Sequence, residues 1–162
     1  MKNKLNHAGR YAPGRPFHGH HWITRDQTAS STSRGVAPQH RILCVDDEIE
    51  GTRIRGQILE EEGYSVVLHH SPLAALRCDL SKFSLAILDF EMPELNGREL
   101  LLRMRALGAR FPIVLLTGSV DSLSPENRVL FARCIDKGAP IRYLLATIAE
   151  FIGIDRIPDF GT

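Results

Sequence analysis

Residues 85–97 read LAILDFEMPELNG. The first four residues are all apolar, as expected for a parallel strand that is covered on both faces. The apolar run ends at Asp89, and the turn-rich residues 92–97 follow it. We therefore predict a central strand over Leu85–Phe90 that places a carboxylate near its carboxyl end.

The same pattern continues on both sides of this strand, where apolar runs alternate with amphipathic stretches. Such alternation is typical of strand–helix repeats that form a parallel sheet, and it predicts a doubly wound α/β fold. The other strands are predicted over Arg41–Val45, Tyr64–Leu68, Pro112–Leu116 and Arg133–Asp136. The helices are predicted over Ile49–Glu62, from the N-cap Ser71 and Pro72 to Leu76, over Arg98–Leu107, within residues 124–132, and over Pro140–Ile152.

Two of these helices carry apolar residues at helical spacing, which indicates the side that faces the core. In the first helix the residues expected to face inward are Ile54, Ile58 and Leu59. In the third helix they are Leu100, Leu101, Met104 and Leu107.

Composition divides the chain into three parts. Residues 1–39 are rich in Gly, Pro, His, Ser, Thr and Arg and show no sustained periodicity, which predicts a disordered, basic N-terminal extension. Its low acid content is also typical of a transit peptide, but no amphipathic helix accompanies it. Residues 40–155 form the predicted folded domain, and residues 156–162 form a short C-terminal tail.

Charge and cysteine content narrow the functional classes. The formal net charge is +1 and no groove-reading motif is present, so we expect no direct nucleic-acid binding. No apolar run reaches membrane-spanning length, and the first residues lack a secretory signal, so we expect no membrane association. The three cysteines form no CxxC pair, which argues against a disulfide framework or a closed zinc site. A cytoplasmic protein fits these features best.

Polar residues follow four of the predicted strands. Asp46 and Asp47 come after the first strand, Asp89 ends the third, Thr117 follows the fourth and Lys137 follows the fifth. The carboxyl ends of parallel strands meet at one edge of a sheet, so these side chains are expected to converge. Clustered carboxylates repel one another unless a cation compensates them, and Mg²⁺ prefers such oxygen ligands. An aspartate can itself be a nucleophile toward phosphorus.

Four motifs in this order resemble the receiver domain of two-component response regulators. They are residues 42–48 (ILCVDDE), residues 85–97, residues 113–118 (IVLLTG) and residues 136–138 (DKG). The resemblance covers roughly residues 40–155, and it implies a flavodoxin-like, five-stranded parallel sheet with strand order 2-1-3-4-5 and helices on both faces.

The resemblance also implies a role for each polar residue at the strand ends. A histidine kinase or phosphotransfer protein donates a phosphoryl group to such domains in a Mg²⁺-dependent reaction. Asp89 matches the phosphoacceptor, Thr117 the switch hydroxyl and Lys137 the lysine of the family pattern. The implied metal ligands are Asp47 directly, Asp46 largely through water, Asp89, and the backbone carbonyl of Glu91.

Two positions depart from the family pattern. Cys134 stands where receivers commonly carry Tyr or Phe, and Gly138 follows the lysine where proline is usual. Both adjoin the fourth helix, fifth strand and fifth helix, the usual output face of the family. We expect a downstream protein target to bind this face, and a homodimer could form through its helices. In receivers that carry the aromatic residue, its ring changes position with the switch hydroxyl. Because Cys134 stands there in this chain, we expect the switch hydroxyl to be coupled to this face in a different way.

The leading hypothesis is a stand-alone response regulator that signals through protein contacts and catalyses only its own phosphorylation and dephosphorylation. A phosphorylation-independent, receiver-like interaction module is the alternative. A less favoured hypothesis is an aspartate-nucleophile phosphohydrolase, because Glu91 stands where those enzymes place a second aspartate. His69 and His70 are interpreted as loop residues away from the site, and the His-rich residues 18–21 as a solvated stretch.

Overall fold

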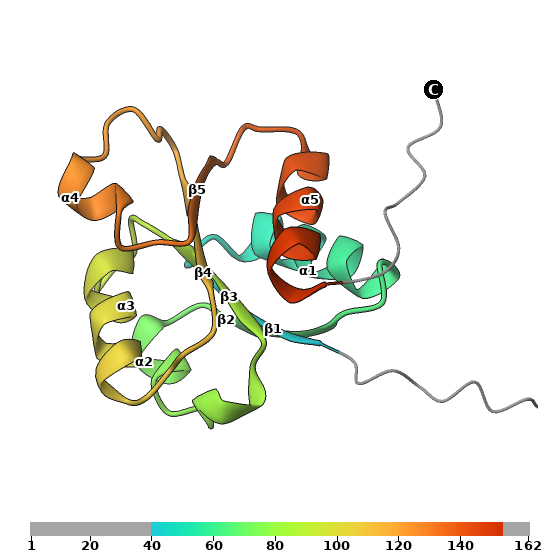
Figure 1. Cartoon of the computed structure of the whole chain (residues 1–162), viewed down its shortest axis with the longest axis horizontal. Coiled ribbons are helices and arrows are strands. Elements are labelled where there is room, and N and C mark those ends of the chain that lie inside the picture. The colour runs from blue at the N-terminus through green and yellow to red at the C-terminus, as the bar shows by residue number, and fades with distance from the viewer. Residues whose placement is uncertain (1–39, 154–162) are drawn as a thin grey trace, which may run out of the picture. The chain divides into compact units, whose positions relative to one another are not determined.

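The computed structural model describes residues 40–153, so the predicted extension (residues 1–39) and tail (residues 156–162) lie outside the described residues. Five parallel strands form one sheet with the order β2-β1-β3-β4-β5 (Figure 1). This order confirms the predicted doubly wound fold. The strands are β1 (Arg41–Val45), β2 (Ser65–His69), β3 (Leu85–Asp89), β4 (Ile113–Thr117) and β5 (Arg133–Asp136).

Helices cover both faces of the sheet (Figure 1). One face packs against α2, α3 and the short 3₁₀ helix η1, and the other packs against α1 and α5. The bounds are α1 (Ile49–Glu61), α2 (Pro72–Ala75), η1 (Leu80–Lys82), α3 (Gly97–Ala106), α4 (Pro125–Arg128) and α5 (Ile141–Ile152). None of the helices in residues 40–153 is long and apolar enough to cross a membrane.

β3 is the central strand, as its composition predicts. All five of its residues are buried. Ala86 and Leu88 point into the core under α2 and α3, whereas Leu85 and Ile87 point into the core under α1 and α5. Both cores therefore hold β3 in place, and the position of Asp89 at its carboxyl end is fixed by packing on two sides.

Two residues predicted to face the core are exposed. Ile54 is 55% exposed, because α1 instead turns Thr52, Gly56 and Leu59 inward. At about 100° per residue, Ile54 lies roughly 200° around the helix from Gly56, which is the opposite side. Leu107 is 60% exposed because α3 ends at Ala106, one residue before it.

Candidate functional site

The polar residues at the strand ends converge at the carboxyl edge of the sheet. Asp46 and Asp47 follow β1 and Asp89 ends β3, and one oxygen from each carboxylate lies within 4.8 Å of the others. Thr117 ends β4 and is buried, and its carbonyl oxygen accepts a hydrogen bond of 2.7 Å from the amide of Lys137. The structure thus brings together the side chains of both aspartate motifs through adjacent strands of the sheet.

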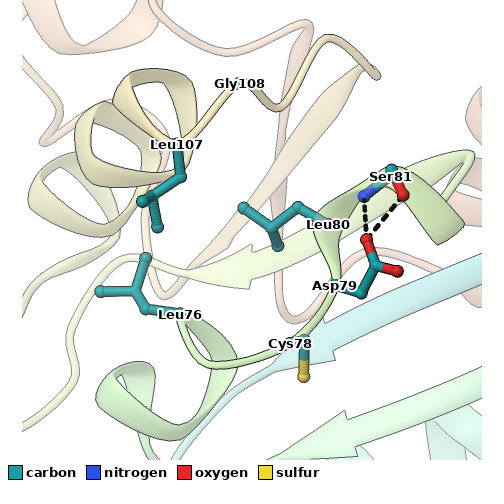
Figure 2. Close-up of a pocket in the computed structure, with 7 residues that line it drawn as sticks. All are labelled: Leu76, Cys78, Asp79, Leu80, Ser81, Leu107 and Gly108. Carbon is teal, nitrogen blue, oxygen red and sulfur yellow. Dashed lines mark hydrogen bonds between the residues drawn. The ribbon is translucent and has the colours of Figure 1, made fainter.

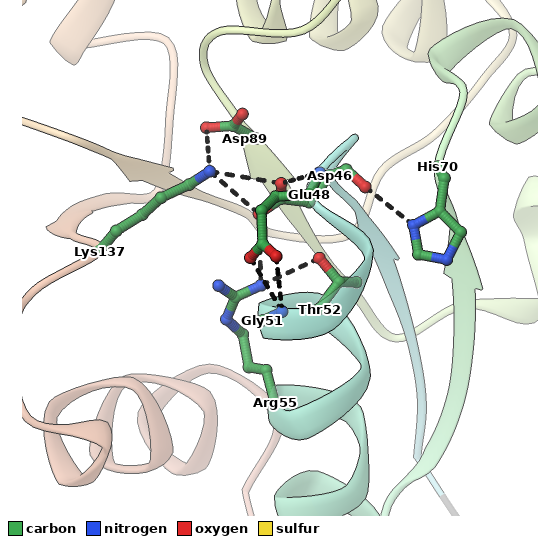
Figure 3. Close-up of polar contacts among 8 residues, drawn as sticks. All are labelled: Asp46, Glu48, Gly51, Thr52, Arg55, His70, Asp89 and Lys137. Atoms are coloured by element: carbon green, nitrogen blue, oxygen red, sulfur yellow. Dashed lines mark hydrogen bonds and ion pairs between the residues drawn. The ribbon is translucent and has the colours of Figure 1, made fainter.

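Lys137 bridges two of the three carboxylates (Figure 3). Its Nζ lies 3.0 Å from Asp89 Oδ1 and 3.2 Å from Asp46 Oδ2. The side chains of these aspartates are only 4% and 3% exposed, so the ion pairs are largely shielded from water. Partial burial acts to lower the pKa of Lys137, but the hydrogen bonds to Asp89 and Asp46 and the charges of these carboxylates together outweigh burial and raise it above its ordinary value. Lys137 is therefore a firmly charged partner of the cluster.

Burial has the opposite consequence for Asp89. It raises the pKa of the carboxyl above 3.8, and the neighbouring charge of Asp46 adds to the increase. The hydrogen bond from Lys137 opposes both effects without cancelling them. Ionised Asp89 therefore carries a free-energy cost when no metal is bound, and a divalent cation among the carboxylates would relieve it.

Arg55 is a second cation at this site, and it belongs to none of the four sequence motifs. Its guanidinium NH1 lies 3.4 Å from Asp46 Oδ2 and 3.5 Å from the hydroxyl of Thr52, as Figure 3 shows. Arg55 lies beside Gly56 on α1 and three residues after Thr52, two of the three residues that α1 turns inward. No sequence motif indicates this contact, because packing sets which side of α1 faces the sheet.

Asp46 and Asp47 have different surroundings. Asp46 accepts hydrogen bonds from the backbone amide of Glu48, from Lys137 and from Arg55. Protein donors therefore already occupy both of its carboxylate oxygens. Asp47 is exposed at the same edge of the sheet. This difference fits direct coordination of a metal by Asp47 and contact through water by Asp46.

His70 is a loop residue after β2, as predicted, but it contacts the site instead of lying away from it, and His69 belongs to the strand. His69 is the last residue of β2, and its carbonyl accepts from the amide of Asp46 at 3.1 Å. The next residue, His70, donates from Nδ1 to the carbonyl of Asp46 at 3.0 Å (Figure 3). The parallel pairing of Val45 with His69 brings these residues together. The sequence of either strand alone does not predict this register.

The carboxylate set fits a hard divalent cation. Mg²⁺ takes oxygen ligands, and it commonly binds one or two carboxylates while it keeps part of its water shell. Asp47 is exposed and Asp89 is buried, and each supplies a carboxylate to such a site beside Asp46. Within residues 40–153, this cluster is the one group of three side chains that could hold a metal ion.

The sequence profile of the response regulator receiver domain matches residues 42–139. This chain belongs to that family. Its relatives include a homolog of the transcriptional regulatory protein CpxR from Haemophilus influenzae, which is 34% identical over 69% of this chain and 50% of that protein. The transcriptional regulatory protein YkoG of Bacillus subtilis is 39% identical over 47% of this chain and 34% of that protein. The chain thus spans half or less of the length of these relatives.

Solved receivers have the same fold. A CheY-like receiver domain protein from Methanospirillum hungatei is 32% identical, with a TM-score of 0.61 over 69% of this chain and 92% of that chain. The response regulator TrrA of Thermotoga maritima, solved in complex with Mg²⁺ and BeF, is 29% identical. Its TM-score is 0.61 over 70% of this chain and 99% of that chain.

One of the two departures from the receiver pattern, Cys134, contacts α4. Cys134 on β5 is half-buried, and its thiol donates to the carbonyl of Arg128, with a sulfur–oxygen distance of 3.9 Å. Burial raises the pKa of this thiol. Asp136 Oδ1 accepts a 2.6 Å hydrogen bond from the amide of Val120. The loop after β4 is therefore tied to β5 by this carboxylate, and α4 is a single turn at the end of that loop.

Glu91 lies in the loop between β3 and α3, and its side chain is exposed. The amide of Gly97 closes this loop with a 2.8 Å hydrogen bond to the carbonyl of Phe90. At the start of α3, Asn96 and Glu99 form a reciprocal capping box. The backbone of the loop is therefore held close to Asp89 from both of its ends.

A pocket of about 310 Å³ lies elsewhere on the receiver (Figure 2). Leu76, Leu80 and Leu107 form its apolar wall, and Asp79 accepts hydrogen bonds from the amide and hydroxyl of Ser81 at its edge. Leu107 follows the last residue of α3, whereas Asp89 lies against Gly97, the first residue of that helix. Ten residues of helix separate them by about 15 Å. The pocket is therefore distinct from the carboxylate cluster.

We predict that Asp89→Asn stabilises the metal-free receiver at neutral pH. Because the folded pKa of Asp89 is raised above 3.8, the native state binds more protons than the unfolded state, and stability falls as the pH rises through the interval between the two values. Asparagine removes that cost, and we expect a melting temperature about 2–5 °C higher at pH 7 in EDTA. Thermal denaturation followed by circular dichroism measures it.

The gain should shrink as the pH is lowered through the raised pKa of Asp89, because the folded wild type then takes up a proton there. Added Mg²⁺ should raise the melting temperature of the wild type more than that of the variant. A variant that melts below the wild type at pH 7 without metal would contradict the electrostatic account.

Proposed function

We propose that this receiver accepts a phosphoryl group on Asp89 from a histidine kinase or phosphotransfer protein, with Mg²⁺ bound at the carboxylate cluster. The observation that carries the proposal is the buried carboxylate of Asp89, held 3.0 Å from Lys137 Nζ and beside two further aspartates. The TrrA receiver in complex with Mg²⁺ and BeF supports it by similarity.

The chemistry follows from the positions of these groups. A carboxylate oxygen of Asp89 forms a bond to phosphorus as the bond from phosphorus to the donor nitrogen breaks, and the electron pair of that bond leaves with the donor imidazole. In this proposal Lys137 pairs with one phosphoryl oxygen through its positive charge, and the hydroxyl of Thr117 donates a hydrogen bond to another. Bound Mg²⁺ supplies further charge neutralisation there.

The proposed ligands of Mg²⁺ are Asp47, Asp89 and the backbone carbonyl of Glu91, with Asp46 acting largely through water. Asp46 suits that indirect role because its oxygens already accept from Glu48, Lys137 and Arg55. The receiver contributes alignment and charge to its own phosphorylation and dephosphorylation, and it is not proposed to turn over a separate substrate.

The proposed output is a protein contact on the face formed by α4, β5 and α5. Large apolar side chains are exposed on these elements, with Val129 after α4 at 79% and Tyr143 on α5 at 54%. A downstream protein or a second copy of the receiver could bury them. We place this activity in the cytoplasm, where a kinase donor and reduced cysteines coexist.

A small phosphodonor such as acetyl phosphate tests the phosphoryl-transfer step without a cognate kinase. We expect intact-mass spectrometry to show the gain of one phosphoryl group in Mg²⁺ and no gain in EDTA. The absence of any label in Mg²⁺, from protein that is folded by circular dichroism, would overturn the proposal.

A phosphorylation-independent interaction module is the second candidate, and Cys134 favours it. Cys134 has no aromatic ring whose position could change with that of the Thr117 hydroxyl. The neighbouring α4 also has only one turn. Under this function, Mg²⁺ and beryllofluoride would leave the backbone NMR signals of α4, β5 and α5 unchanged. Large shifts of those signals on addition of beryllofluoride would rule it out.

A further inference from the structure

Two cations meet the same buried carboxylate in this receiver. Lys137 Nζ is 3.2 Å and Arg55 NH1 is 3.4 Å from Oδ2 of Asp46, whose side chain is 3% exposed. The side chain of Arg55 is itself only 14% exposed. The charge of Arg55 is therefore weakly screened by solvent, and it acts strongly on whatever ion occupies the cluster.

The formal charges of the site depend on Arg55 in a specific way. With three ionised aspartates, Lys137 and Arg55, the metal-free cluster has one net negative charge. Bound Mg²⁺ would reverse this to one net positive charge. A phosphoryl group on Asp89 would replace one negative charge by about two, and the cluster would then be neutral.

Without Arg55 the balance is different. The metal-free cluster would carry two net negative charges, and Mg²⁺ alone would neutralise it. Phosphorylation would then add an uncompensated negative charge. Arg55 therefore moves the electrically balanced state from the metal-loaded cluster to the cluster that holds both Mg²⁺ and a phosphoryl group.

We propose that Arg55 couples Mg²⁺ binding to phosphorylation. It opposes Mg²⁺ at the unmodified cluster, both by its charge and by occupying an oxygen of Asp46, and the phosphoryl group removes this opposition. The proposal rests on the proposed function, because it takes Asp89 as the phosphoacceptor and the cluster as the Mg²⁺ site. Arg55 acts through Asp46 and is thus a positioning residue. By linkage, Mg²⁺ must favour the phosphoryl group as much as the phosphoryl group favours Mg²⁺.

The test compares Mg²⁺ affinity with and without beryllofluoride, the phosphoryl mimic, by isothermal titration calorimetry. For Arg55→Gln we expect Mg²⁺ alone to bind about tenfold tighter than to the wild type, since a nearby buried positive charge is removed. The further increase in Mg²⁺ affinity caused by beryllofluoride should be about tenfold smaller in this variant.

Two variants separate the charge of Arg55 from its packing. Arg55→Lys keeps the positive charge, and both affinities should stay within about threefold of the wild type. Arg53→Gln removes a charge from an exposed position on the same helix, and it should leave both affinities unchanged. A role for Arg55 in packing alone would lower the stability of Arg55→Gln but would leave the effect of beryllofluoride on Mg²⁺ affinity as in the wild type.

The outcomes distinguish this inference from the function on which it rests. If the wild type binds Mg²⁺, Asp47→Asn loses that binding, and Arg55→Gln has unchanged or weaker affinity for Mg²⁺, the coupling role of Arg55 is wrong while the metal site stands. If the wild type itself binds no Mg²⁺ with or without beryllofluoride, the proposed function fails first.

Discussion

Asp89→Asn should abolish labelling of the receiver by a small phosphodonor in Mg²⁺. Asparagine has nearly the same shape but lacks the carboxylate oxygen that forms the bond to phosphorus. We expect the labelled fraction to fall by about a hundredfold or more, because no alternative nucleophile replaces a group that makes the covalent bond. Intact-mass spectrometry with peptide mapping measures both the amount and the position of the label.

Asp79→Asn is the matched control for this variant. Asp79 is an exposed aspartate beside the pocket at the far end of α3, where it caps η1 (Figure 2). The control should be labelled like the wild type. Equal labelling of Asp89→Asn and the wild type would refute the assignment of the phosphoacceptor. Misfolding would not explain a lost label, because Asp89→Asn is expected to melt above the wild type in the absence of metal.

Gly97→Ala should destabilise the receiver by about 2–4 kcal/mol, in the range of severe steric substitutions. Gly97 is the first residue of α3, and a Cβ there would meet the carbonyl oxygen of Asp89 and lie 3.1 Å from Cα of Phe90. These are backbone atoms of a strand end held by two cores, so they cannot move aside as a flexible side chain would. The gain in helix propensity, up to about 1 kcal/mol, is too small to compensate.

Urea denaturation measures this loss, and Gly138→Ala provides the comparison. A Cβ at Gly138 meets no heavy atom within 4 Å, so this substitution should change the free energy of unfolding by less than about 0.5 kcal/mol. A similarly small change for Gly97→Ala would show that α3 can move away from Asp89. Because the clash involves the carbonyl of the proposed phosphoacceptor, Asp89, the labelling rate of any folded Gly97→Ala protein should also fall.

The position of the proposed phosphoacceptor and the arrangement of the proposed output face are governed by different parts of the fold. Asp89 ends β3 and Lys137 follows β5, with β4 between these strands, and an ion pair of 3.0 Å joins the two side chains. Cys134 contacts the C-terminal end of a one-turn helix through a weak sulfur hydrogen bond. The site is therefore rigidly built, whereas the link from Thr117 to α4 lacks the aromatic ring on which many receivers rely.

Much of this fold and of the cluster could be predicted from local patterns in the sequence. The uninterrupted apolar run before Asp89 required burial on both faces and so placed its strand in the middle of the sheet. Once the strands were parallel, Asp46, Asp47 and Lys137 had to end at the same edge as Asp89. These conclusions needed the order and spacing of residues, and they needed no knowledge of which atoms touch.

Only the tertiary structure decided which additional groups reach the cluster. Arg55 meets Asp46 because α1 is rotated to bury Gly56 against Leu68 of β2, the same rotation that leaves Ile54 exposed. His70 reaches the carbonyl of Asp46 through the register between β1 and β2. Helix rotation and strand register are settled by side-chain packing between segments distant in sequence. The sequence alone therefore identified the candidate residues of the phosphoryl site. Packing determined that Arg55 reaches them, and we expect Arg55 to change their affinity for Mg²⁺.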